Sequence, residues 1–238
     1  MSSPTSTRWR PQPGHTALAI IAIVLLAVTG ILSLVETGVF QPYFGGLPPL
    51  MVVAVVIVLG GVCLSWLMSR HGLRLGMVPS GTGNLRVPVA AATLMAIVVI
   101  AVDVAVGYPR DINVAPPASL VFYPLIACVA EIVFHVAPLT LLLLVLGPVF
   151  RRGVPRGSAA IVVCLAALPE SVFQVRLGAT GDGPSVLDMF TGVHLFVFGL
   201  VALSIFRRYD FASMLAFRLV YYLYWHVVWG YLRLSLRF

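Results

Sequence analysis

Lysine is missing from this sequence, and charged residues of either sign are scarce. Only 10% of the 238 residues are charged, whereas 60% are hydrophobic and the mean hydropathy is +1.03. A soluble domain needs a charged and polar surface, and its composition does not reach these values. The scarcity of charge therefore excludes an ordinary soluble protein and predicts an integral, multi-pass membrane protein.

Cysteine is also rare, and the positive charge lacks the pattern of a nucleic-acid-binding protein. Cys63, Cys128 and Cys164 lie inside apolar runs, where a thiol behaves as a small hydrophobe, so they indicate no disulfide framework and no cysteine-based metal site. The net charge of +7 comes from arginine alone, and no basic stretch is interleaved with aromatic residues. We therefore expect the lipid bilayer, with its anionic headgroups, as a partner, and no nucleic acid.

Apolar runs long enough to cross a bilayer recur along the chain. About 20 apolar residues span the hydrocarbon core as a helix. The runs of this length are 17–35, 47–68, 87–108, 118–150, 157–175, 186–206 and 211–234. The sequence therefore predicts an all-α, polytopic membrane helical bundle with about seven transmembrane helices. We expect a disordered cytoplasmic leader at 1–16, three spans within 17–108 and a four-span core at 118–238.

The fourth run is longer than one crossing requires. Pro138, Gly147 and Pro148 could kink it or lay its end along the interface, and a second crossing is the alternative. We expect one crossing with an interfacial extension, because arginine is then concentrated on the side of the N-terminus. That side holds Arg8, Arg10, Arg70, Arg74, Arg86, Arg151, Arg152, Arg156, Arg207 and Arg208, and the other side holds Arg110, Arg176, Arg233 and Arg237. The bias predicts a cytoplasmic N-terminus and an external C-terminus, in a bacterial cell membrane.

Few polar side chains lie inside the predicted spans, and an ionisable residue at membrane depth needs a partner, a cavity or a substrate path. The candidates are Asp103, Glu131, His135, Glu170, Gln174, His194, Arg218 and His226. The helix rise places Glu170, His194 and His226 at one depth, about 18 to 22 Å from the inner ends of their spans. Glu131 and His135 are four residues apart and share one helix face. We expect Glu131, His135, Glu170 and His226 to converge on one cavity.

Other roles compete for these residues. His194 also fits a hydrogen bond between helices, and His226 lies in an aromatic segment typical of a membrane interface. Asp103, near the end of its span, fits a solvated terminus, and Arg218 fits a side chain that snorkels to the inner surface. The two glutamates have no comparable route to water, and their alternative is a protonated carboxyl bonded to neighbouring backbone.

Three segments of the C-terminal half form an ordered series. Residues 130–135 read Ala-Glu-Ile-Val-Phe-His, residues 166–174 read Ala-Ala-Leu-Pro-Glu-Ser-Val-Phe-Gln, and residues 226–230 read His-Val-Val-Trp-Gly. A glycine-led helix from Gly199 to the basic pair Arg207-Arg208 precedes the third segment. The series resembles the CAAX prenyl protease and bacteriocin-processing (CPBP) family of intramembrane endopeptidases. The motifs of that family are, in order, Glu-Glu-x-x-x-Arg, Phe-x-x-x-His and His-x-x-x-Asn.

The resemblance implies a hydrolytic mechanism and a membrane-embedded or lipidated peptide as substrate. In the family, a glutamate activates water for attack on the peptide carbonyl, and His and Asn side chains stabilise the oxyanion. Glu131 would then be the base, and His135 or His226 the electrophilic group. A divalent metal such as zinc is the cofactor that Glu131, His135, Glu170 and His226 would suit, although no His-Glu-x-x-His spacing specifies one.

The chain departs from the family motifs at four positions, and this leaves two other hypotheses open. Ala130 replaces the first Glu, His135 the Arg, Glu170 or Gln174 the His, and Gly230 the Asn. A catalytically inert relative would bind a membrane partner or peptide in the same cavity. A proton or ion carrier would use the buried Glu and His residues as a relay, but the sequence shows none of the paired half-repeats of such carriers.

Overall fold

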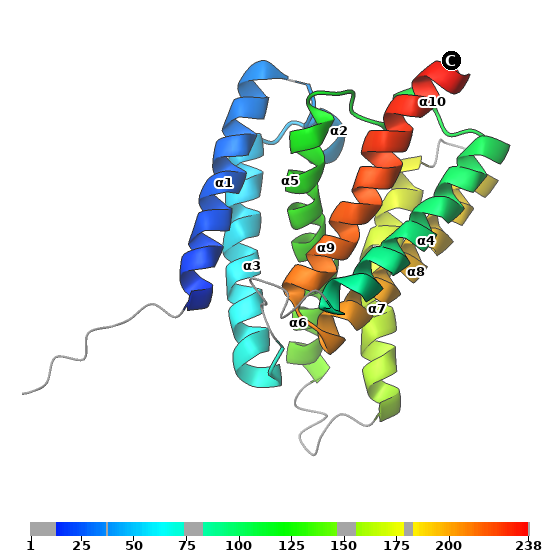
Figure 1. Cartoon of the computed structure of the whole chain (residues 1–238). Coiled ribbons are helices and arrows are strands. Elements are labelled where there is room, and N and C mark those ends of the chain that lie inside the picture. The colour runs from blue at the N-terminus through cyan, green and yellow to red at the C-terminus, as the bar shows by residue number, and fades with distance from the viewer. Residues whose placement is uncertain (1–12, 37, 74–82, 147–155, 179–182, 238) are drawn as a thin grey trace, which may run out of the picture.

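The computed structural model describes residues 13–36, 38–73, 83–146, 156–178 and 183–237, and this part of the chain consists of helices joined by loops, without a β-strand (Figure 1). Seven of the described helices are long and apolar enough to cross a membrane. They are Leu18–Val35, Pro49–His71, Leu85–Ala105, Ser119–Leu146, Ala159–Gly178, Val186–Arg208 and Phe211–Leu236. The predicted fold class is therefore confirmed: the protein is an all-α, polytopic membrane bundle.

The spans are assembled from α-helices with short 3-10 and π segments. In chain order the elements are α1 (Pro13–Val35), α2 (Gln41–Phe44), α3 (Pro49–His71), α4 (Gly83–Ala105), the 3-10 turn η1 (Arg110–Ile112), α5 (Ser119–Glu131), the π-helical η2 (Ile132–Val136), α6 (Ala137–Leu146), α7 (Arg156–Gly178), α8 (Val186–Arg208), α9 (Phe211–Tyr222), the π-helical η3 (Leu223–Trp229) and α10 (Gly230–Arg237). In a bilayer no water can satisfy the backbone, so each apolar run closes its hydrogen bonds within one helix.

The fourth run crosses once, as predicted. α5, η2 and α6 follow one another without a break from Ser119 to Leu146 and count as a single span. The start of α1 and the C-terminus lie at opposite ends of the bundle in Figure 1, as an odd number of crossings requires. The expected interfacial extension after Leu146 and the first twelve residues of the expected leader lie outside the described residues. The remaining leader positions, 13–16, are helical rather than disordered and form the start of α1.

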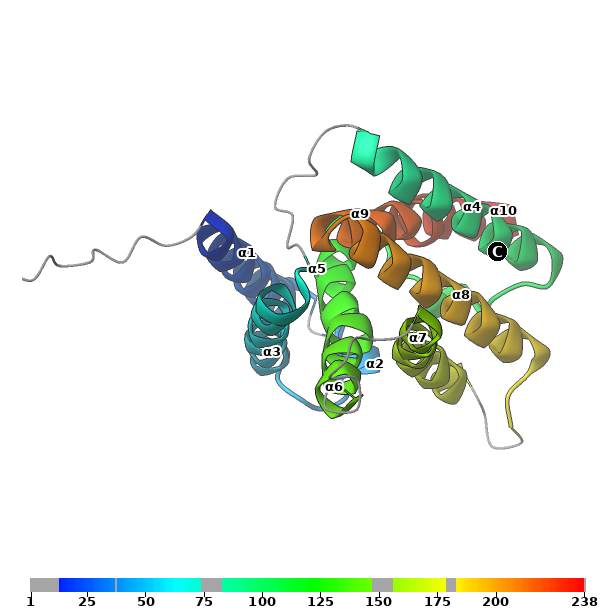
Figure 2. The same cartoon turned by 90° about the horizontal axis from the view of Figure 1, so that it is seen from below.

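The bundle is organised around α5 and α9, which pack on each other. α7 runs along α8, α4 along α9, and α1 along α3 (Figure 2). Phe122, Phe198, Phe217 and Met214 fill the space between these helices with side chains that are completely buried. Large apolar residues such as Leu34 remain exposed on the outside, where the bilayer is their solvent.

Local sequence signals set the helix ends that position the site. The Ser185 hydroxyl accepts from the Asp188 N–H while the Asp188 carboxylate accepts from the Ser185 N–H, a capping box that starts α8. Asp210 caps α9 by accepting from the Ser213 N–H, two residues after α8 ends. Gly72 ends α3 in the left-handed conformation, at φ +64°.

Two spans contain a π-helical segment, and each segment carries an imidazole. In η2, which holds His135, the Ala137 N–H bonds to the Ile132 carbonyl, one residue further back than in an α-helix. Pro138 follows directly and has no N–H to donate, so the wider turn lies where the α-helical pattern is already interrupted. The second segment, η3, holds His226. Single π turns inside helices are frequent at functional sites.

Candidate functional site

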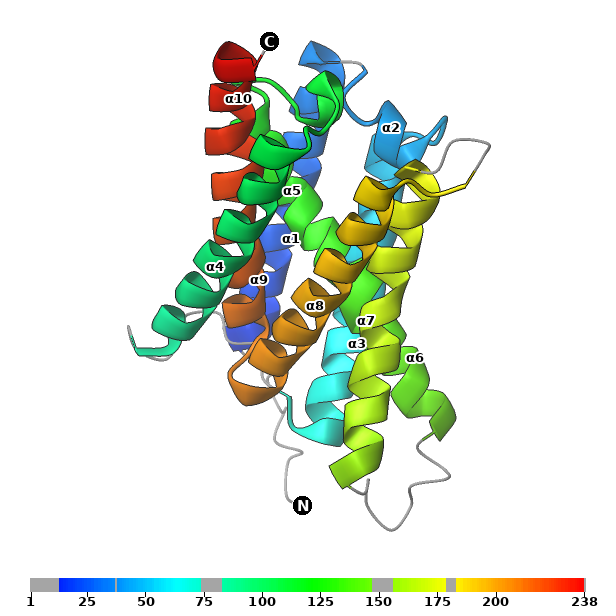
Figure 3. The same ribbon diagram turned by 90° about the vertical axis from the view of Figure 1, so that its right-hand side faces the viewer.

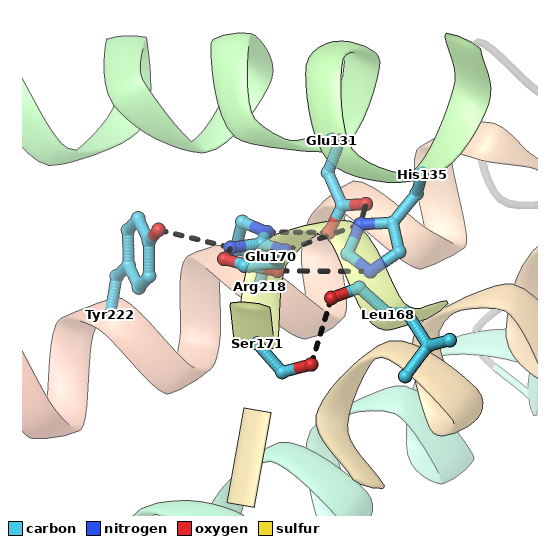
Figure 4. A network of polar contacts seen from close by, with 7 residues as sticks. All are labelled: Glu131, His135, Leu168, Glu170, Ser171, Arg218 and Tyr222. Atoms are coloured by element: carbon cyan, nitrogen blue, oxygen red, sulfur yellow. Dashed lines mark hydrogen bonds and ion pairs between the residues drawn. The ribbon is translucent and has the colours of Figure 1, made fainter. Parts of the chain in front are cut away.

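A buried arginine joins three helices in the middle of the bundle (Figure 4). Arg218 of α9 is 1% exposed, and its Nε donates to Oε1 of Glu131 on α5 at 2.6 Å. Its Nη1 and Nη2 each donate to one carboxylate oxygen of Glu170 on α7, both at 2.7 Å. Paired charged bonds of this bidentate kind are the strongest that side chains make. The guanidinium therefore ties α5, α7 and α9 to one another.

His135 and Tyr222 complete what we call the arginine cluster: Glu131, His135, Glu170, Arg218 and Tyr222. His135 Nδ1 lies 3.0 Å from Glu131 Oε2 and 3.3 Å from Arg218 Nη2, and its Nε2 lies 3.7 Å from Glu170 Oε2. The Tyr222 hydroxyl accepts from Arg218 Nη1 at 3.0 Å. Three of the four residues expected to converge, Glu131, His135 and Glu170, thus meet in one place.

Of the two roles left open for Arg218, the structure excludes snorkelling. The side chain does not snorkel to the inner surface, because it is fully occupied at its own depth by two carboxylates. A signal for this was present in the sequence. Glu131 and Glu170 lie in apolar runs and need a counter-charge, and Arg218 is the arginine nearest the middle of a predicted span.

Small residues let α7 and α8 come close to the imidazole. A Cβ at Gly199 would lie 2.9 Å from His135 Nε2 and 3.1 Å from the Ala167 Cβ. On the same turn of α8, the Phe198 ring lies 4.7 Å from the guanidinium carbon of Arg218 and packs as a cation–π contact. Gly199 is therefore the position where any larger residue would displace His135.

Two atoms of the arginine cluster make no hydrogen bond among the described residues: Oε2 of Glu131 and Nε2 of His135. Their only polar contacts in that part of the chain are ion-pair distances, 3.0 Å to His135 Nδ1 and 3.7 Å to Glu170 Oε2. The side chains of Glu131 and His135 are both 0% exposed. Buried polar atoms without partners are uncommon in folded proteins, and each asks for an explanation. The two carboxylates face one guanidinium, and an imidazolium at His135 would be needed to balance them. The hydrogen bonding of the cluster is therefore incomplete at these two atoms.

A second buried arginine, Arg233, forms a cluster with Asp103 near the C-terminal end of α4. More of the polar atoms of this cluster have hydrogen-bond partners. Asp103 is 0% exposed, so the solvated terminus expected for it was wrong. Its carboxylate accepts from Arg233 Nε and Nη2 at 2.9 and 3.0 Å, from Trp229 Nε1 at 2.7 Å and from the Tyr108 N–H at 2.7 Å. Arg233 also donates to the carbonyls of Tyr108 and Pro109. This arrangement holds α10 against α4.

A central cavity of about 480 Å³ lies between α3, α4, α5, α7, α8 and α9, within the size range of small-molecule sites. Aromatic side chains make up much of its wall: Tyr43, Phe44, Tyr108, Tyr123, Phe134, Phe173, Tyr221, Tyr222 and Trp225. Glu170, Gln174, His194 and His226 line it as well, whereas Glu131 and His135 are not on the wall. Burial raises the pKa of the Tyr43 phenol, so this group stays a neutral hydroxyl.

His226 lines the same cavity as Glu170 and touches the arginine cluster through Tyr222, whose ring centre lies 4.8 Å from that of the imidazole. Its Nδ1 pairs with Oδ1 of Asn113 at 2.7 Å, and its ring stacks on Tyr123 with centroids 4.5 Å apart. Asn113 presses against Gly230, where an added Cβ would lie 2.9 Å from Asn113 Nδ2. That Nδ2 is buried without a partner among the described residues. No spacing in the sequence pointed to Asn113, because it follows the short turn η1 outside every predicted span.

The two secondary residues on the cavity wall differ in their partners. His194 of α8 pairs through Nε2 with the Tyr221 hydroxyl of α9 at 3.2 Å, which is the bond between helices that its sequence context also allowed. Gln174 is half-buried, one helical turn beyond Glu170 on α7. Both supply hydrogen-bonding groups to an otherwise apolar space.

The four candidate metal ligands do not form a metal site. No group of three or more His, Cys, Asp and Glu side chains in the described part of the chain could hold a metal ion. Between Glu131 and Glu170, the guanidinium of Arg218 takes the position that a shared cation would need. His226 is engaged with Asn113 and makes no ion pair with either glutamate.

Comparisons with protein family models, with curated proteins and with solved structures found no match to this chain. The resemblance to the CPBP family therefore rests on the three sequence segments alone.

Proposed function

We propose that this protein is a diverged CPBP-type membrane protein that binds a membrane-embedded or lipidated peptide in its central cavity without hydrolysing it. Of the two hypotheses, we favour a catalytically inert relative over a peptidase. The arrangement of the two buried glutamates supports this choice.

Hydrolysis needs a carboxylate that can take a proton from a water molecule at the substrate. Glu170 reaches the cavity, but Arg218 holds both of its oxygens at 2.7 Å. Oε2 of Glu131 accepts no hydrogen bond, but His135 Nδ1 lies 3.0 Å from it, and the side chain is 0% exposed and is not on the cavity wall. The family motif has its first glutamate at the position of Ala130, which does line the cavity. Neither glutamate thus combines access to the cavity with a carboxylate free of charged neighbours, since Arg218 also holds Oε1 of Glu131 at 2.6 Å.

The cavity itself suits an apolar guest with a few polar groups. Its wall is mainly aromatic and aliphatic, and Gln174, Thr191, His194 and His226 place hydrogen-bonding groups at separate points along it. Ligand sites commonly combine a large apolar surface with a few polar groups that fix orientation. A peptide carrying a lipid chain has the same combination of apolar and polar parts.

Hydrolysis remains the second candidate, because of one specific observation. His226 pairs with an asparagine amide, as the His-x-x-x-Asn motif of the family would provide, but Asn113 supplies that amide from the loop after η1. Asn113 sits against Gly230, the position where the motif would have its asparagine. The pair that stabilises an oxyanion in the family thus has a spatial counterpart here.

The binding proposal is tested with a fluorescent farnesylated peptide and the purified protein in neutral detergent. Leu195 lines the cavity, whereas Val193 of the same helix is 63% exposed and faces away from it. Leu195→Trp should fill the space and lower the affinity about tenfold or more, a loss of roughly 1.4 kcal/mol. Val193→Trp is the matched control and should bind like the wild type. Equal affinities in the two variants would place the peptide elsewhere.

The same samples separate binding from hydrolysis by mass spectrometry of the peptide after long incubation. Wild type and Glu131→Gln should both bind the peptide and leave it intact. Cleavage by the wild type that disappears in Glu131→Gln, at equal amounts of folded protein, would establish the peptidase instead. A general base usually contributes about 10² to 10⁴-fold, so the difference would be unmistakable.

We further infer that the N-terminus faces the cytoplasm and the C-terminus the outside of a bacterial cell membrane. The exposed arginines Arg70, Arg86, Arg207 and Arg208 end or begin their helices on the side where α1 starts. Arginine is enriched in cytoplasmic segments of bacterial membrane proteins. A periplasm-dependent reporter fused after Phe238 should be active, and activity of a cytoplasm-dependent reporter alone would reverse the orientation.

A further inference from the structure

A groove of about 400 Å³ lies between α4 and α8, away from the central cavity. Its apolar walls include Val87 of α4 and Val197, Leu200 and Val201 of α8, and Ser204 and Arg208 lie toward the end of α8. We call it the α4/α8 groove. The residues of α8 that line the central cavity, such as His194 and Leu195, come earlier along the helix, and the two sites share no lining residue. The groove therefore forms a separate site.

Positive charge gathers at one end of this groove. Arg208 is exposed and its guanidinium lies 5.7 Å from the centre of the Tyr209 ring. Arg207 beside it and Arg86, next to Val87 on α4, are exposed too. None of the three arginines makes an ion pair with an acidic side chain in the described part of the chain. The acid that follows, Asp210, is 3% exposed and is used as the cap of α9.

The charged end of the groove lies at the boundary of the membrane-spanning part. Arg208 is the last residue of the sixth span, and Val87 is near the start of the third. Figure 3 shows the last turn of α8 and the first turn of α4 at the same end of the bundle. An apolar channel that leads from the membrane interior to arginines at its edge matches a phospholipid in both polarity and direction. Basic pockets between transmembrane helices bind anionic headgroups in this way.

We propose that the α4/α8 groove binds an anionic glycerophospholipid, with its phosphate on Arg208 and one acyl chain along Val197, Leu200 and Val201. Arg86 and Arg207 add attraction for a headgroup with net negative charge. The bound lipid fills the space between α4 and α8 and holds α8 against its neighbours. The same helix carries Phe198 and Gly199, which contact the arginine cluster, so the lipid stabilises the region around that cluster by preferential binding to the folded state. This inference does not depend on the proposed function.

Native mass spectrometry of the protein in neutral detergent tests the site, with phosphatidylglycerol and phosphatidylcholine of equal chain length as probes. Phosphatidylglycerol should bind at least about fivefold more tightly, since one arginine near the surface contributes roughly a factor of five. Arg208→Gln should remove most of that preference. Arg70→Gln is the matched control, an exposed arginine at the end of α3 on the same side of the bundle, and should keep the preference.

A second variant tests the apolar part independently of charge. Ser204 is exposed in the groove, and Ser204→Phe should weaken both lipids while leaving the arginines in place. Glycerol phosphate, which has the charge but no acyl chain, should compete poorly. Equal preference in Arg208→Gln and the wild type, an equal loss in Arg70→Gln and Arg208→Gln, or full competition by glycerol phosphate would each overturn the proposal.

Discussion

Replacing Arg218 by methionine should destabilise the protein more than any other single change at the site. The variant removes the donor of four short hydrogen bonds, at 2.6, 2.7, 2.7 and 3.0 Å, and leaves two carboxylates buried without a cation. Removing one partner of a buried ion pair costs about 3 to 5 kcal/mol. With about 2 to 4 °C per kcal/mol for a chain of this size, the denaturation temperature should fall by roughly 6 to 20 °C.

Charge imbalance, rather than lost packing, should cause that fall. Methionine fills much of the space of the arginine stem, so most of the cost comes from Glu131 and Glu170. The triple variant Arg218→Met, Glu131→Gln, Glu170→Gln should therefore recover most of the loss, because replacing a whole buried ionic group by neutral residues is often neutral or stabilising. Arg176→Met, which changes an exposed arginine at the end of α7, is the control and should shift the temperature by no more than about 2 °C.

Thermal denaturation in detergent, followed by tryptophan fluorescence at one fixed scan rate, measures these differences. The reasoning fails if Arg218→Met denatures within about 2 °C of the wild type. It also fails if the triple variant is no more stable than Arg218→Met, since the damage would then come from packing and not from the two carboxylates.

Three further changes test other parts of the structure. Asp103→Asn should lower stability by about 3 to 5 kcal/mol in the same thermal assay, because it leaves a buried arginine without its counter-charge; a shift under about 2 °C would contradict the ion pair. Gly199→Ala should cost about 1 to 3 kcal/mol, because the new methyl overlaps His135 Nε2. Gly61→Ala, whose new methyl meets nothing within 4 Å, should be neutral or stabilising. A similar loss of stability in Gly61→Ala and Gly199→Ala would show that the contact with His135 is not its cause. Ala130→Glu puts a carboxylate on the cavity wall where the CPBP motif has one, and should produce slow cleavage of the farnesylated peptide, measured by mass spectrometry; a folded variant without activity would count against the family relationship.

The number of spans and the single crossing of the fourth run could be read from the sequence, because run length and hydropathy report directly on the thickness of the bilayer. The ends of the helices were predicted less accurately. α4 starts at Gly83 and stops at Ala105, displaced by a few residues from the predicted 87–108, since the turn chemistry at each end, and not hydropathy, decides where a helix stops.

The candidate site could be predicted only in part, because sequence gives depth and spacing but not the direction in which each helix faces. Glu131 and His135 were placed together correctly by their four-residue spacing. His226 was expected at the depth of Glu170, but its hydrogen bond is to Asn113 and not to the carboxylates. The sequence left a route to water open for Arg218, since its carboxylate partners are 48 and 87 residues away in the chain. Residues so far apart in the chain leave no local sequence pattern that would reveal their contact.

The placement of both buried arginines in the span Phe211–Leu236 has a consequence for biosynthesis. Asp103 is made 130 residues before Arg233, and at about 5 to 20 residues per second this is a delay of roughly 7 to 26 seconds. Glu131 and Glu170 likewise emerge from the ribosome before Arg218. Until that span is inserted, the three carboxylates lack their guanidinium partners. The span thus supplies both arginines at once, and a ribosome that stalls before residue 211 leaves a membrane intermediate whose buried acids lack them.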